Sequence, residues 1–406
     1  MSSPTSQNSI IPASFSLLCK ILSPWTSDTD HAIVKEAINN SALDWQKLTE
    51  YANRANLTPA LRYALSEKGL WETVPPELQE YLDAMHQFNT ERNEAIFQHL
   101  GRLIQILNKA GITPLLIKGG AALATGLYPD PAIRFMMDLD ILVPENVLMQ
   151  SVSALEKQGY YVPEANLTTN PNFNPETCKH YLPLVHDDET AHVELHRTLL
   201  SDDQAALLPT EHVWRDALLC KSGQMKEVSF FIMSPTHQIL HSIIHSEISH
   251  ANYKAERLEL RQLLHFAYLC KRHTDSTDWQ QVQSQMNYEK TSQALRAYLY
   301  SAEMLLGVVT SFALEPDAEA KLHFSKMILG NVEGKYYISR MISGEVAHIK
   351  EAFSKQGLLL RLPRLNHCSV GWLRLRYIMV LINRYSTVEK LKGYFARKIH
   401  SLISTG

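Results

Sequence analysis

The sequence predicts an α+β protein, in which a small mixed β-sheet is flanked by N-terminal and C-terminal helical regions. Segments 113–117, 138–143 and 191–195 are β-like and are separated by connections rich in Gly, Pro and Asn. Helical periodicity precedes them and returns after about residue 205. Because strands and helices do not alternate regularly, the pattern disfavours a doubly wound α/β fold.

Length and composition predict a globular protein with several domains. The 406 residues exceed one ordinary core, and the net charge of −3 gives no global nucleic-acid signal. We expect four regions: an N-terminal helical region at 1–95, an α/β core at 96–204, a helical domain closing a cleft at 205–325, and a basic helical C-terminal region at 326–406.

Cysteine usage and hydropathy favour a reducing compartment, and we expect the cytoplasm. The five cysteines are scattered and form no CxxC pair, which predicts neither a disulfide framework nor a zinc knuckle. No apolar run is long enough to span a bilayer. The N-terminal apolar patch lacks a preceding basic stretch, so we interpret it as the start of a helix rather than a signal peptide.

Helices on both sides of the first strand follow from apolar spacing and from Pro and Gly. Residues 44–70 carry apolar side chains at intervals of three and four. Pro75-Pro76 predicts the start of a long helix that ends near Gly111. Residues 145–159 form a shorter amphipathic helix after the second strand.

The strongest chemical signal is a pair of aspartates on the second predicted strand. Strand alternation places Asp138 and Asp140 on one face, while Leu139 and Ile141 point to the other face. On the third predicted strand, Glu194 shares a face with two histidines. A DxD pair or one strand glutamate is often structural when it occurs alone.

Three converging carboxylates require a compensating cation, because each pair at about 6 Å costs roughly 3 kcal/mol at an effective dielectric near 20. Hard oxygen ligands favour Mg²⁺ or Mn²⁺ over zinc. Two such ions activate an attacking hydroxyl and stabilise a leaving pyrophosphate oxygen. We therefore expect Asp138, Asp140 and Glu194 to be metal ligands and catalytic residues.

A glycine turn before a short helix suits phosphate binding. In Lys118-Gly119-Gly120, glycine allows backbone N–H groups to approach a phosphate, and the following helix presents its positive end. Lys118 or Arg134 would neutralise phosphate oxygens. The turn matches neither the Walker pattern nor the dinucleotide pattern, and Gly-Gly alone is usually a plain turn.

The ordered combination of these motifs resembles the DNA polymerase β-like nucleotidyltransferase superfamily. Within it, LLIKGGAALATGLYPDPAIRFMMDLDILV followed by HVELHRTL is similar to the uncharacterised bacterial nucleotidyltransferase family. The leading DWQKLTEYANRANLTPAL resembles the helical N-terminal region of that family, and the similarity fades towards the C-terminus.

The resemblance implies a nucleotidyltransferase core with a metal site on Asp138, Asp140 and Glu194, and with Gly119 and Gly120 lining the triphosphate. Gly-Gly replaces the more frequent Gly-Ser of the superfamily, so a serine contact to phosphate is absent. The acceptor stays open, because the resemblance fixes only the reaction class.

Histidines in the helical region have three interpretations. His237, His241 and His245 follow at i, i+4 spacing, with His250 beyond them. Glu247 is out of phase for the HExxH zinc motif. The stripe is either a polar face lining a cleft, a contact to nucleotide or acceptor, or a metal site.

Basic residues dominate the chain from Lys355 onward, with Trp372, Tyr377, Tyr385 and Tyr394 interleaved. Such a segment is typical of contact with RNA, an anionic membrane surface or a phosphorylated acceptor. The alternative is a helical cap whose basic face offsets the acidic remainder of the chain.

The sequence therefore predicts an NTP-dependent, two-metal nucleotidyltransferase acting on an unidentified hydroxyl of a small molecule, protein or RNA. Two alternatives stay open. One is a non-catalytic nucleotide-binding or interaction module on the same fold, and the other is a transferase acting on tRNA or RNA ends.

Overall fold

The computed structural model describes residues 11–331 apart from 26, 41–42, 171–172, 224, 226 and 311–316. These residues belong to one compact unit, which spans Met1–Glu333. The basic region predicted from Lys355 onward lies outside the described residues.

The N-terminal part is helical, as predicted. The predicted helical stretch 44–70 consists of two helices separated by a tight turn, in which Asn56 has a φ of +54°. The helices are α1 (Ala13–Leu22), α2 (Asp28–Asn39), α3 (Trp45–Arg54), α4 (Thr58–Glu67) and α5 (Pro76–Lys109).

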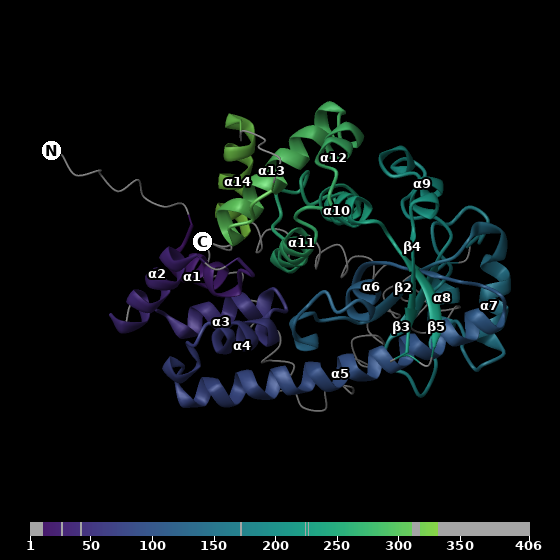
Figure 1. Ribbon diagram of the computed structural model, residues 1–406, viewed down its shortest axis with the longest axis horizontal. Helices are drawn as coiled ribbons and strands as arrows, with labels where there is room; N and C mark the ends of the chain where they lie inside the picture. The colour runs from purple at the N-terminus through teal and green to yellow at the C-terminus, as the bar shows by residue number, and fades with distance from the viewer. Residues whose placement is uncertain are drawn as a thin grey trace, which may run out of the picture. The chain divides into compact units, whose positions relative to one another are not determined.

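Helix α5 is the longest element of the described chain, with 34 residues. It begins at Pro76, where proline at the first helical position leaves no donor unsatisfied, and Gly111 follows its end with a φ of +77°. Both features confirm the prediction. In Figure 1, α5 runs from beside α4 to the sheet, and it packs against both.

A five-stranded mixed sheet forms the centre, in the order β3-β2-β1-β5-β4. β2 and β3 are parallel, as are β1 and β5, whereas β1–β2 and β4–β5 are antiparallel. The strands are β1 (Leu115–Leu116), β2 (Asp138–Leu142), β3 (His192–His196), β4 (Leu218–Ser222) and β5 (Val228–Ile232). The α+β prediction is confirmed.

One face of β2 and β3 is apolar and fully buried. Leu139, Ile141, Val193 and Leu195 are each 0% exposed. They pack with the second half of α5 and with α7 (Leu148–Glu156), which follows β2. The opposite face of these strands is therefore the one that carries the polar residues.

Strands β4 and β5 were not predicted from the sequence, and they lie beyond the α/β core predicted at 96–204. The β-rich run of β5, Val-Ser-Phe-Phe-Ile, is short and lies in a region of mostly helical pattern. The sheet thus draws strands from residues on both sides of position 204, and α5 passes through position 95 without interruption.

The remaining helices follow the sheet. A π-helix (Ile244–Ser249) continues directly from α10, and it becomes important for the site. The other helices described are α6 (Lys118–Ala124), α8 (Glu164–Thr169), α9 (Thr210–Arg215), α10 (Pro235–Ile243), α11 (Leu260–Arg272), α12 (Trp279–Gln285), α13 (Glu289–Leu306) and α14 (Ala318–Asn331).

Helices α1 and α13 share one hydrophobic core. Leu18 of α1 and Leu305 of α13 belong to the same buried cluster, together with residues of α4, α10 and α11. Ser23 Oγ donates a hydrogen bond of 2.6 Å to the backbone carbonyl of Leu306. Helical regions that are separate in sequence are therefore one packed body.

None of the helices in the described part of the chain combines the length and the apolar character that crossing a bilayer requires. The described cysteines are free thiols, of which Cys19 and Cys270 are buried and Cys178 and Cys220 are half-buried.

Candidate functional site

Parallel pairing of β2 and β3 brings the predicted carboxylates together. Asp140 lies opposite Glu194 in the register, and Asp138 lies opposite His192. Asp140 is only 4% exposed, whereas Asp138 and Glu194 are half-buried. The polar face of these two strands is therefore the candidate site.

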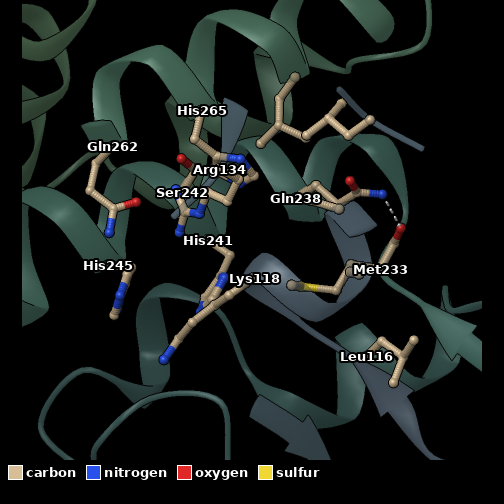
Figure 2. A pocket seen from close by; sticks show the side chains of 14 residues that line it. Leu116, Lys118, Arg134, Met233, Gln238, His241, Ser242, His245, Gln262 and His265 are labelled. Carbon is tan, nitrogen blue, oxygen red and sulfur yellow. Dashed lines mark hydrogen bonds between the residues drawn. The ribbon is translucent and has the colours of Figure 1, made fainter. Parts of the chain in front are cut away.

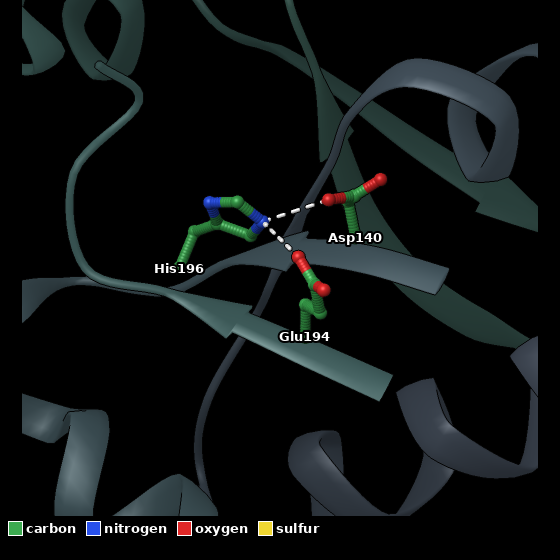
Figure 3. Close-up of side chains that lie close together, drawn as sticks. All are labelled: Asp140, Glu194 and His196. Carbon is green, nitrogen blue, oxygen red and sulfur yellow. Dashed lines mark hydrogen bonds and ion pairs between the residues drawn. The ribbon is translucent and has the colours of Figure 1, made fainter. Parts of the chain in front are cut away.

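His196 joins the two carboxylates (Figure 3). Its Nε2 lies 2.8 Å from Asp140 Oδ1 and 3.6 Å from Glu194 Oε2. Because an ionised carboxylate only accepts hydrogen bonds, Nε2 is the donor. Figure 3 shows the second oxygen of Asp140 pointing away from the imidazole.

Lys118 supplies a second cationic or donor group to the same carboxylate. Its Nζ donates a hydrogen bond of 2.7 Å to Asp140 Oδ1. Lys118 begins α6 with a φ of +51°, in the left-handed region that non-glycine residues rarely adopt. Such strained residues cluster at functional sites, where the surrounding structure holds them in place.

These contacts decide the charge of both acids. Burial works to raise the pKa of Asp140, but hydrogen bonding from His196 and the charge of Lys118 outweigh it and hold the pKa well below its ordinary value. The interaction with His196 lowers the pKa of Glu194, against burial and the nearby charge of Asp140. Both carboxyls are therefore ionised at neutral pH.

The two glycines after Lys118 have different surroundings. A Cβ at Gly119 would meet the Met136 side chain, which would have to shift, so glycine leaves room for this close approach beside the cavity. A Cβ at Gly120 would lie 3.6 Å from Leu139 Cδ2, on the packed side of α6. The structure thus places Gly119 at the site and Gly120 beneath it.

Two buried asparagines hold the segment that carries Arg134. Asn93 Nδ2 donates to the carbonyls of Pro131 and Arg134, and Asn89 Nδ2 donates to those of Ala132 and Arg134. Both asparagines project from one face of α5, since they are four residues apart. Helix α5 therefore fixes the backbone from which Arg134 reaches the cavity.

A cavity of about 440 Å³ contains the candidate residues except Gly120. Ligand sites commonly have volumes of 300–1,000 Å³. Its cationic wall includes Lys179, whose pKa is lowered by burial and by the Lys118 charge. The cavity is lined by Lys118, Gly119, Arg134, Phe135, Met136, Met137, Asp138, Asp140, Lys179, His180, Glu194, His196, His245, His250, Arg261 and Gln262.

The histidine stripe divides between two pockets, which supports the interpretation of a polar face lining a cleft. His245 and His250 line the large cavity. His241 and His245 line a small adjoining pocket of about 30 Å³, shown in Figure 2 beside Lys118 and Arg134. His237 lines neither and lies 3.9 Å from Asp216. Burial is the main cause that lowers the pKa of His241 to about 3.

The donor set fits a divalent cation. Asp140, Glu194 and His196 each offer one ligand atom, and these atoms lie within 4.8 Å of one another. A histidine that ligates a metal usually donates its other ring N–H to an acceptor, but Nδ1 of His196 has no partner among the described residues. This favours the carboxylate oxygens as ligands, with His196 as a hydrogen-bond donor to them.

Most of the residues predicted for the site line this one cavity: the polar face of the strands, Gly119 of the glycine turn, and Arg134. The sequence pattern placed His196 beside Glu194 without a role, and it gave no signal for Lys179, which lies in an irregular segment. Backbone hydrogen bonds from Arg197 and Thr198 to the Lys179 carbonyl, and the bridge between His180 and His196, hold that segment beside β3.

Comparison with known families gives one match. The family described as "Uncharacterised nucleotidyltransferase" matches residues 41–307, which is more than half of the chain. The matched range includes the strands, the cavity and helices α3 to α13. A search of curated proteins finds no match.

Proposed function

Because the chain belongs to the uncharacterised nucleotidyltransferase family, we propose that it moves a nucleoside monophosphate from a nucleoside triphosphate to a hydroxyl-bearing acceptor, with release of pyrophosphate. The convergence of Asp140 and Glu194 beside a cationic cavity wall is the observation that carries this proposal. We assign the fold to the DNA polymerase β-like superfamily on the order of its motifs.

In this proposal, the cationic wall binds the triphosphate. Lys118, Arg134 and Lys179 line the cavity that the carboxylates face. Within the part of the chain that the structure describes, Arg134 Nε and Nη1 are buried without a hydrogen-bond partner, so phosphate oxygens would satisfy donors that are costly to leave unpaired. The Gly119 backbone would let a phosphate approach closely. Gly120 packs against Leu139 and would act only indirectly, by shaping the turn.

Asp138, Asp140 and Glu194 would hold Mg²⁺ or Mn²⁺, with two ions as the fuller form of the proposal. A bound divalent ion would neutralise the carboxylates and polarise the α-phosphate. His196 and Lys118 keep Asp140 ionised and oriented, as the lowered pKa of that carboxyl indicates.

The transfer then needs a base that takes the proton of the attacking hydroxyl. The acceptor hydroxyl attacks the α-phosphorus in line, its oxygen forms the new P–O bond, and the bond to the pyrophosphate oxygen breaks. Glu194 takes the hydroxyl proton in our assignment, because it is ionised and lines the cavity.

A labelling experiment tests the proposal. The protein is incubated with each α-labelled nucleoside triphosphate, Mg²⁺ and a cell extract, and the labelled fraction is identified. We expect label to enter one metabolite or macromolecule with the wild type and not with Asp138→Asn or Asp140→Asn. Transfer retained by both single variants would overturn the assignment.

The two alternatives give different results. A non-catalytic module predicts thermal stabilisation by Mg²⁺ and nucleotide without any labelled product. A transferase acting on RNA ends predicts labelled RNA and salt-dependent RNA binding that is lost on removal of the chain from Lys355 onward.

A further inference from the structure

A second wall of the cavity includes two neutral rings and an amide, and Arg261 of α11 also lines the cavity. His245, His250 and Gln262 line it, and they come from the π-helix and α11 rather than from the sheet. This wall has no part in the phosphate chemistry above.

The π-helix is what places the two rings together. The backbone N–H of His250 bonds to the carbonyl of His245 at 3.1 Å, the i+5 spacing that defines a π-helix. In an α-helix, residues five apart point about 140° away from each other. Here the imidazole centroids lie only 4.2 Å apart, so the turn presents two rings on one side.

Both rings are uncharged, which suits stacking rather than phosphate binding. Burial is the main cause that lowers the pKa of His245 and of His250, and the charge of Lys118 adds to it. His250 is exposed and offers a ring edge or face to a ligand in the cavity. Aromatic side chains bind bases in this way without needing charge.

Gln262 supplies a directional group beside the rings. The residue is 9% exposed, and its backbone carbonyl accepts a hydrogen bond from Tyr298. Its side-chain amide bonds to no other residue in the described part of the chain. Figure 2 shows it on the same side of the pocket as His245. A glutamine amide pairs with adenine through a donor and an acceptor at once.

From this arrangement we propose that the wall of His245, His250 and Gln262 binds the base of the nucleoside triphosphate, with adenine preferred. The inference rests on the proposed function and assigns its nucleotide specificity to these residues. The phosphates lie against the cationic wall, and the base stacks on the imidazole pair while Gln262 contacts its edge.

Calorimetric titration with Mg²⁺ and either inorganic tripolyphosphate or a non-hydrolysable ATP analogue separates the two walls. The wild type binds the nucleotide more tightly than tripolyphosphate, and more tightly than the matching GTP analogue. We expect His250→Ala and Gln262→Leu each to weaken nucleotide binding by about five-fold or more. Tripolyphosphate binding stays unchanged in both variants.

Two further variants serve as controls. His250→Phe keeps a ring and retains most of the nucleotide affinity, whereas His212→Ala removes a half-buried histidine of α9 outside the cavity and changes neither ligand. Circular dichroism and thermal melts confirm that each variant is folded.

Equal nucleotide affinity in the wild type, His250→Ala and Gln262→Leu would overturn the base assignment. If tripolyphosphate still binds in that case, the proposed transferase function stands. A change confined to the KM of the acceptor would also overturn the assignment, since it would make the wall an acceptor site. If the wild type does not bind tripolyphosphate, both proposals are wrong.

Discussion

Asp140 and Glu247 are both buried carboxylates, with exposed fractions of 4% and 8%, yet their charges differ. Asp140 lies on β2 between Lys118 and His196, and its pKa is held well below the ordinary range. Glu247 lies in the π-helix, and burial raises its pKa to about 7.

The difference shows that burial alone does not set the charge of these acids, because the partners of Asp140 outweigh burial and those of Glu247 do not. The hydrogen-bond donor to Glu247 is the neutral hydroxyl of Ser246, at 2.8 Å from Oε1. The charges of Glu259 and Arg257 act on Glu247 in opposite directions. An acid that must stay ionised for chemistry therefore needs direct cationic or donor contacts.

Removing the charge of Asp140 has the largest expected effect on activity. Asp140→Asn keeps the size of the side chain but loses the ionised oxygens that would hold the metal. We expect transfer activity to fall by about 10³-fold or more. The rate is measured with labelled nucleoside triphosphate, and a thermal melt checks that the variant is folded. Activity within ten-fold of the wild type would contradict the assignment.

Removing the charge of Lys118 tests whether that partner keeps Asp140 ionised. Lys118→Met takes away the hydrogen bond to Oδ1, and the pKa of Asp140 rises because only His196 still opposes burial. We expect a loss of about 1–3 kcal/mol in the free energy of unfolding at pH 7. Urea denaturation measures it.

The sign of this effect gives a second check on Lys118. A lowered carboxyl pKa stabilises the folded protein above the unfolded value of 3.8, and that stability is lost as the pH falls below it. The deficit of Lys118→Met shrinks only as the pH falls through the raised Asp140 pKa of the variant, because the unfolded state is common to both proteins. If carbon-13 NMR shows that Asp140 titrates at no higher pH in the variant than in the wild type, lost packing and not charge is responsible.

Neutralising Glu247 tests whether ionisation of this buried acid destabilises the fold. The folded pKa of about 7 exceeds the ordinary 4.5, so ionisation destabilises the fold as the pH rises from 4.5 through 7. Glu247→Gln avoids this cost. We expect the variant to gain up to about 3 kcal/mol over the wild type at pH 8.5 and to lose that advantage at pH 4.5.

Urea denaturation at several pH values measures the Glu247 effect. Glu303→Gln, an exposed acid on α13, is the matched control and should show no such dependence on pH. A pH-independent difference between Glu247→Gln and the wild type would mean that Glu247 is not the titrating group.

The smallest expected effect comes from the neutral partner of Glu247. Ser246→Ala removes the hydroxyl that donates to Oε1, and this hydroxyl lowers the pKa of Glu247. We expect that pKa to rise further and stability at neutral pH to fall by about 1 kcal/mol. A carbon-13 NMR titration of the Glu247 carboxyl measures the shift, and an unchanged pKa would exclude the serine contact.

The sequence predicted the polar face of β2 because the relevant signal is local. Alternation along five residues separates Asp138 and Asp140 from Leu139 and Ile141, and any strand formed there shows the same pattern. Alternation along the third predicted strand singled out Glu194 as the third carboxylate, and the parallel β2–β3 register places it opposite Asp140.

The parts that escaped prediction depend on contacts distant in sequence. Lys179 reaches the cavity through backbone bonds from the segment after β3, and β5 joins the sheet by pairing with β1, more than a hundred residues earlier. The π-helix also had no sequence signal, because HSIIHSEISH has an ordinary helical composition. Nothing in short-range spacing encodes these arrangements.

The bond from Ser23 to Leu306 and the core shared by α1 and α13 have a consequence for biosynthesis. The chain leaves the ribosome from its N-terminus, so α1 emerges long before α13, which covers part of its apolar side. Vectorial folding of the N-terminal region is therefore incomplete until α13 has been synthesised. During that interval, the nascent chain exposes an apolar surface suited to a chaperone.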